Sequence, residues 1–132
     1  MGPVDETGRL RADVVGALRE DAAMTRVEFL WFDGCPSHAP ARALLDDVIA
    51  LVAPGTPVEA IDASDPEVAA AHRFPGSPTI RVDGIDIDPS YVDTGDYVPR
   101  CRLFRTAEGL RGVPPREWIE NALARAQSRP SK

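Results

Sequence analysis

The stretch of residues 27–32 constrains the fold more than any other part of the sequence. Apart from Glu28 it is an unbroken run of aliphatic and aromatic residues, namely Val27, Phe29, Leu30, Trp31 and Phe32. Such runs are typical of β-strands covered on both faces, whereas a strand with one solvated face alternates apolar and polar residues. The sequence therefore predicts a central strand here, in a sheet that other elements cover on both sides.

The segments that follow alternate between helical and extended patterns. Residues 41–52 are apolar on one side of a helix, and Pro54-Gly55 ends that pattern. We expect Ser37 to cap this helix, because that places Pro40 in the first turn, where its missing N–H costs nothing. Residues 58–61 predict a second strand. The sequence Ser64-Asp65-Pro66-Glu67 predicts the start of a helix that runs to about Phe74.

The pair Asp83-Gly84 predicts a β-hairpin between strands at residues 79–82 and 85–88, because both residues accept the positive φ of a type I′ turn. Beyond it we expect a loop over residues 89–99, another strand over 100–105 and a final helix over 114–126. Strand, helix and strand followed by helix, hairpin and helix predict an α/β fold with a mixed sheet flanked by helices.

Composition narrows the function classes. The chain has 132 residues and a formal charge of −6, which fits one globular domain and argues against a nucleic-acid partner. Its apolar runs are far shorter than the roughly 18 residues of a membrane span, so we expect no membrane partner. No apolar leader follows the first methionine, so we expect a cytoplasmic protein. In that reducing compartment Cys35 and Cys101 are expected as thiols.

Three parts are predicted along the chain. Residues 1–24 form an N-terminal arm, in which Leu10, Val14 and Leu18 predict a helix over residues 8–23. Residues 25–127 form the folded domain, and residues 128–132 a disordered polar tail. The oligomeric state is left open by these patterns.

A cysteine lies in the turn after the first buried strand, in Trp31-Phe32-Asp33-Gly34-Cys35-Pro36-Ser37-His38, and Gly76-Ser77-Pro78-Thr79 opens the hairpin strand. These two motifs resemble those of the thioredoxin-like family. The resemblance spans residues 26–88 and the last helix. It implies a thioredoxin-like mixed sheet and a cis Ser77-Pro78 bond. It also implies a substrate site at Ser77, Pro78 and Thr79, where the backbone of Ser77 faces a bound partner.

Cys35 is the expected nucleophile. A thiol close to a helix N-terminus has its thiolate stabilised by free N–H groups and by the helix dipole. The alternative is a buried, unreactive cysteine. His38 stands where the family has a second cysteine, and three roles are open: a hydrogen bond to the Cys35 thiolate, half of a Cys-x-x-His metal pair, or an exposed side chain without a task.

Cys101 is the expected replacement for the missing second thiol. The hairpin returns the chain to the end of the sheet where Pro78 and Cys35 lie, which could bring Cys101 within disulfide reach of Cys35. The alternative is that Cys101 faces a core beside Leu103. Arg100 and Arg102 flank it and could bind the carboxylates of a small thiol peptide, although such charges are more often a solvated face.

Three functions follow from these residues. The leading hypothesis is a thiol–disulfide oxidoreductase without a cofactor or metal, acting on a protein or low-molecular-weight thiol or disulfide. The second is an alkylmercury lyase-like or soft-metal-binding protein, in which both thiols bind the metal and an acid such as Asp33 protonates the leaving carbon. The third is a binding module with a thioredoxin-like fold and no catalysis.

Overall fold

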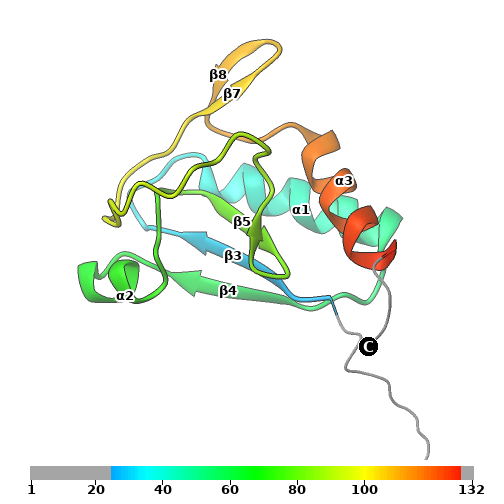
Figure 1. Ribbon diagram of the computed structural model, residues 1–132, viewed down its shortest axis with the longest axis horizontal. Helices are drawn as coiled ribbons and strands as arrows, with labels where there is room; N and C mark the ends of the chain where they lie inside the picture. Colours follow the sequence, from blue (N-terminus) through cyan, green and yellow to red (C-terminus); the bar gives the residue numbers. More distant parts are fainter. Residues whose placement is uncertain (1–24, 129–132) are drawn as a thin grey trace, which may run out of the picture. The chain divides into compact units, whose positions relative to one another are not determined.

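The strand predicted at residues 27–32 is the centre of the sheet. In the computed structural model, which describes residues 25–128, β3 (Val27–Trp31) pairs in parallel with β4 (Val58–Asp62) and antiparallel with β5 (Thr79–Val82). The short strand β6 (Ile85–Asp86) joins β5, which gives the order β4-β3-β5-β6 (Figure 1). The predicted mixed α/β sheet is confirmed.

Both faces of β3 are buried, as its composition predicts. Val27 and Phe29 pack into a cluster that contains residues of α1 (His38–Val52) and α3 (Arg116–Ser128). Leu30 points to the other face and packs with Phe74 and with α2 (Pro66–Ala71). A fully buried Leu or Phe side chain contributes roughly 1.5–3 kcal/mol to folding, so the two clusters stabilise the sheet from both sides.

Helix α1 begins where the position of Pro40 requires. Ser37 is the N-cap residue, as predicted, but its side chain makes no cap hydrogen bond and the backbone carbonyl accepts from Ala41 N instead. A Cβ atom on Gly112 would collide with the Ser37 hydroxyl. The chain that leads to α3 therefore packs tightly against the start of α1.

Helix α2 begins as predicted and ends earlier than predicted. The Asp65 carboxylate caps it by accepting from Glu67 N at 2.7 Å. The helix ends at Ala71 because Arg73 adopts a left-handed φ of 53°. Phe74 N then donates back to Ala69 O at 2.9 Å, and the Phe74 ring enters the core.

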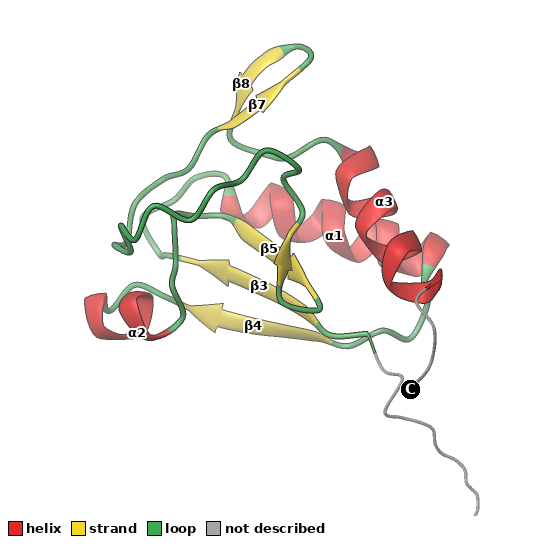
Figure 2. Cartoon of the chain, viewed as in Figure 1, coloured by secondary structure: helices red, strands yellow, loops and turns green. Residues whose placement is uncertain are grey.

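The predicted hairpin turn is confirmed, and its second strand is shorter than predicted. Asp83 and Gly84 have φ values of 54° and 80°, as a type I′ turn requires. Strand β6 ends at Asp86, because the Asp86 carboxylate accepts from Asp88 N at 2.9 Å and turns the chain. Residues 89–99 contain no strand or helix, as predicted, and belong to the long loop drawn green between β6 and β7 in Figure 2.

The strand predicted at residues 100–105 is wrong. Cys101 makes only an isolated parallel bridge with Ser77. The residues that follow enter a second hairpin, which was not predicted from the sequence. Its strands are β7 (Phe104–Thr106) and β8 (Gly109–Arg111), and it stands away from the four-stranded sheet in Figure 1. The sequence feature that could have indicated this hairpin is Gly109, which follows its turn and adopts a φ of 103° that favours glycine.

The ends of the chain differ from the predicted boundaries. Helix α3 begins at Arg116 and ends at Ser128, each two residues later than predicted, and Ile119, Ala122 and Leu123 are buried. The predicted helix over residues 8–23 and residues 129–132 of the predicted tail lie outside the described residues.

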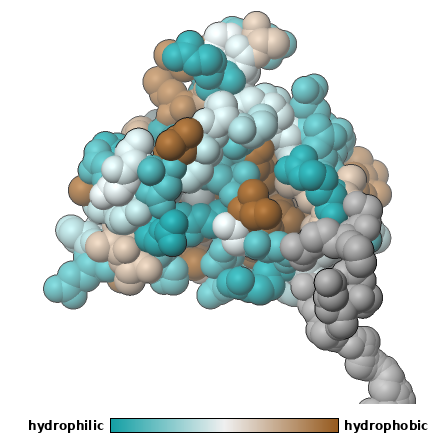
Figure 3. Space-filling view, in the orientation of Figure 1, coloured by the Kyte–Doolittle hydropathy of each residue, from teal (hydrophilic) through white to brown (hydrophobic). Residues whose placement is uncertain are grey.

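On the face drawn in Figure 3, small hydrophobic areas lie among hydrophilic ones. The described residues contain no helix that is long and apolar enough to cross a membrane.

Candidate active site

Cys35 lies directly against the backbone of Ser77. Its own amide donates to Phe32 O at 3.1 Å, which closes the turn after β3. Its side chain is only 3% exposed, and the Sγ–H donates to the carbonyl oxygen of Ser77 at 3.4 Å. The Ser77-Pro78 peptide bond is cis, as the resemblance implied.

The backbone on either side of Cys101 pairs with Ser77. Ser77 N donates to Arg100 O at 2.7 Å, and Arg102 N donates to Ser77 O at 2.8 Å, so Cys101 is held opposite Ser77 in the parallel bridge. The side chains of Cys101 and Cys35 interact, and both are free thiols. The two cysteines whose approach the sequence suggested therefore do interact.

The exposures of the two cysteines are opposite to their expected roles. Cys101 is exposed, and Leu103 is 60% exposed, so the alternative that Cys101 faces a core beside Leu103 is wrong. Cys35, the expected nucleophile, is the buried member of the pair. Partial removal from water raises the pKa of the Cys101 thiol above its ordinary value, and the neighbouring Cys35 raises it further through its charge and hydrogen bonding.

His38 contacts an aromatic ring. Its imidazole stacks on Trp31, with ring centroids 4.8 Å apart and planes 25° from parallel. Among residues 25–128 no hydrogen bond joins His38 to Cys35. The part of the chain that the structure describes also contains no group of three or more His, Cys, Asp or Glu side chains that could hold a metal ion, so a Cys-x-x-His pair has no further ligands there.

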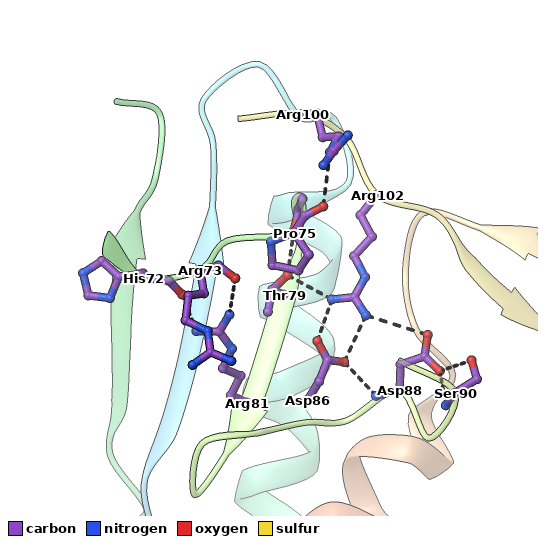
Figure 4. Close-up of polar contacts among 11 residues, drawn as sticks. His72, Arg73, Pro75, Thr79, Arg81, Asp86, Asp88, Ser90, Arg100 and Arg102 are labelled. Carbon is purple, nitrogen blue, oxygen red and sulfur yellow. Dashed lines mark hydrogen bonds and ion pairs between the residues drawn. The ribbon is translucent and has the colours of Figure 1, made fainter. Parts of the chain in front are cut away.

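Arg102 forms a buried ion-pair cluster, shown in Figure 4. Its guanidinium donates to the Asp86 carboxylate at 2.8 and 3.0 Å and to the Thr79 hydroxyl at 3.0 Å, and it lies 3.7 Å from Asp88. The side chains of Arg102, Asp86 and Asp88 are 9%, 5% and 10% exposed. The guanidinium also lies over the Phe104 ring, 4.6 Å from its centroid.

Arg100 and Arg102, which flank Cys101, therefore bond to other groups of the protein. Arg102 faces the fold rather than a surface, contrary to a solvated or substrate-binding position. Arg100 donates to Pro75 O at 3.3 Å (Figure 4). It also pairs with Asp96 at 2.8 Å, which ties it to the loop. The sequence shows Arg102 and the spacing of Asp86 and Asp88, but it gives no sign that the three would be buried together.

The remaining predicted site residues take structural positions. Thr79 is buried and its hydroxyl donates to Gly76 O at 2.6 Å. Asp33 is exposed, and its amide donates to Ser64 Oγ at 2.9 Å. The hydroxyl of Ser77 is buried without a hydrogen-bond partner among the described residues, so this residue contributes its backbone to the site.

Comparison with known proteins adds no family assignment: no protein-family model, no curated protein and no solved structure matches the chain.

Proposed function

We propose that this chain is a thioredoxin-like thiol–disulfide oxidoreductase in which Cys35 and Cys101 alternate between a dithiol and a disulfide. The observation that carries the proposal is the shared backbone of Ser77: its carbonyl accepts the Cys35 thiol at 3.4 Å, and its bridge to residue 101 holds the second thiol beside the first. The sheet order β4-β3-β5-β6 with flanking helices is compatible with the thioredoxin-like fold.

Exposure favours Cys101 as the sulfur that an external disulfide meets first, which reverses the order expected from the sequence. The Cys101 thiolate attacks one sulfur of R–S–S–R′, forms a mixed disulfide with R and releases R′–S⁻, which takes up the proton that Cys101 lost. A raised pKa makes the Cys101 thiolate less abundant at neutral pH and more nucleophilic, so the second effect offsets part of the first.

Cys35 completes the exchange. Its sulfur attacks Sγ of Cys101 while its proton passes to the departing sulfur, so R–SH leaves and the Cys35–Cys101 disulfide forms. Two electrons have moved from the pair to the substrate, and an external dithiol reduces the pair again. The exchange needs no cofactor, because the external dithiol supplies both electrons.

Oxidation of the full chain tests the proposal. We expect a low-molecular-weight disulfide to produce one intramolecular Cys35–Cys101 bond, identified by peptide mass spectrometry, and a dithiol to reverse it. Cys35→Ser and Cys101→Ser should each abolish the bond, whereas Leu103→Ser, an exposed change close by in the chain, should preserve it. Unbridged thiols in the oxidised wild type would reject the proposal.

A second candidate function rests on the same contact between the thiols. Two neighbouring sulfurs without a third ligand in residues 25–128 suit a soft ion that accepts two thiolates, such as Hg(II). Stoichiometric Hg(II) binding that either serine variant abolishes, in a protein whose thiols do not form a reversible disulfide, would favour this metal-handling function. Cysteine variants that keep every activity of the chain would instead favour the binding module without catalysis.

A further inference from the structure

Beside the thiol pair, the backbone of Ser77 is occupied by another segment of the chain. Residues 100–102, called segment 100–102 below, lie along Ser77 and use both of its backbone groups: the amide donates to Arg100 O at 2.7 Å and the carbonyl accepts from Arg102 N at 2.8 Å. An extended peptide docks on a sheet by pairing with free backbone donors and acceptors. At Ser77 those groups are occupied, although the resemblance implied that they would face a partner.

Segment 100–102 is anchored on both sides. The Arg102 side chain is buried in its ion pairs with Asp86 and Asp88, and moving the segment away would leave buried charges without a partner. Beneath it, a Cβ atom on Gly76 would lie 2.8 Å from Cβ of Arg102, so the two backbones approach as closely as a glycine allows. The Arg100 side chain adds a hydrogen bond to Pro75 O.

The accessible sulfur belongs to segment 100–102 itself. Cys101 is exposed, whereas Cys35 lies beneath it and is 3% exposed. A substrate must therefore bring its disulfide to Cys101 without the support of backbone pairing at Ser77. A small, unhindered disulfide meets that requirement, and a disulfide held within a folded or extended protein segment does not.

We propose that the substrates of the Cys35/Cys101 pair are low-molecular-weight disulfides, and that segment 100–102 excludes protein disulfides by occupying the backbone of Ser77. This inference rests on the proposed function. The balance of atoms and electrons is the one given above, with R and R′ as small organic groups and an external dithiol as the reductant.

The test compares two disulfides on the reduced full chain. The probes are bis(2-hydroxyethyl) disulfide and insulin, each measured as the second-order rate of forming the Cys35–Cys101 bond. Each rate is divided by the rate at which dithiothreitol reduces the same probe, which removes the intrinsic reactivity of the two disulfides. We expect this ratio to be about a hundredfold higher for the small probe, because access sets the rate of exchange.

The outcomes separate the inference from the proposed function. Equal ratios for both probes would overturn the exclusion of protein disulfides and leave the oxidoreductase standing. Failure of both probes to form the bond would overturn the proposed function and the inference with it.

Hydrogen exchange tests the anchoring without any substitution. The amides of Ser77 and Arg102 should exchange as slowly as core amides of β3, because Ser77 N donates to Arg100 O and Arg102 N donates to Ser77 O. Exchange as fast as that of an exposed loop would overturn the anchored segment.

A loosened variant, Thr79→Val, removes one acceptor of Arg102 and should raise the insulin ratio, whereas Arg105→Gln on the exposed side should not.

Discussion

Cys35 and Cys101 meet at one carbonyl group, that of Ser77, which accepts the Cys35 thiol and the amide that follows Cys101 in the chain. A carbonyl oxygen has two lone pairs, and both are used here. The relationship positions two thiols from distant parts of the sequence by means of main-chain atoms rather than the Ser77 side chain.

A mixed disulfide should be trapped on Cys101 in the Cys35→Ser variant. Without the second thiol, the product of the first attack persists, and the exposed sulfur is the one that a small disulfide reaches. Mass spectrometry after treatment with bis(2-hydroxyethyl) disulfide should find the adduct on Cys101. A faster adduct on Cys35 in Cys101→Ser would restore the order expected from the sequence.

Alkylation of Cys101 should continue to accelerate with pH beyond the ordinary thiol pKa of about 8.5. Partial removal from water and the neighbouring Cys35 raise the pKa of the Cys101 thiol, so the reactive thiolate is scarcer at neutral pH than in a free cysteine. Cys35→Ser removes one of the two causes and should shift the midpoint of the iodoacetamide rate profile to lower pH. An unchanged midpoint would mean that the two sulfurs do not interact in solution.

Replacing Arg102 with Met should destabilise the fold by about 3–5 kcal/mol, because it leaves Asp86 and Asp88 buried without their cation. Arg105→Met is the matched control on an exposed position of the same stretch and should change the free energy of unfolding by less than about 0.5 kcal/mol. Urea denaturation measures both. Equal effects of the two substitutions would contradict the buried cluster.

Ser77→Ala should preserve both stability and disulfide formation. The Ser77 hydroxyl is buried without a partner among the described residues, so its loss removes no hydrogen bond. Thr79→Val is the contrasting change, since that buried hydroxyl donates to Gly76 O and accepts from Arg102, and its loss should cost about 1–3 kcal/mol. Slow oxidation of the Ser77→Ala protein would show that the hydroxyl takes part in the chemistry.

Asp93 should titrate near pH 2. Hydrogen bonds from Tyr97, Arg73 and the Gly95 amide lower its pKa from 3.8 to about 2. Because the folded state favours the carboxylate, the contribution of Asp93 to stability is present above pH 3.8 and is lost as the pH falls towards 2. Carboxyl-carbon NMR measures the titration, and Tyr97→Phe should raise the midpoint. An unperturbed midpoint in the wild type would contradict the loop contacts.

The central parts of the fold could be predicted from local patterns, and the site only partly. The apolar run around Phe29 and the turn at Asp83-Gly84 act through nearby residues, so sequence periodicity and turn chemistry identify them. The pairing of Cys101 with Ser77 joins segments that are distant in the chain and leaves no periodic signal. The sequence therefore indicated this pairing only indirectly, through the predicted hairpin over residues 79–88, which returns the chain to the end of the sheet where Cys35 lies.

The environment of Arg102 was harder to predict. Charged residues in a loop most often remain solvated, and nothing local distinguishes Arg102 from the exposed Arg105 three positions later. Its burial comes from contacts that are distant in the chain, above all the ion pair with Asp86, and from the Phe104 ring of the second hairpin, which was not predicted.

The bridge between Ser77 and Cys101 also governs how readily the two thiols react with each other. Bringing together cysteines this far apart in a flexible chain costs loop-closure entropy, and here folding has met that cost before any oxidant arrives. The pair therefore has a high effective molarity, which makes its disulfide hard to reduce while the domain is folded. Thermodynamic linkage makes the relation reciprocal: whatever stabilises the folded domain relative to the unfolded chain makes the oxidised pair more persistent, and oxidation in turn protects the domain against unfolding.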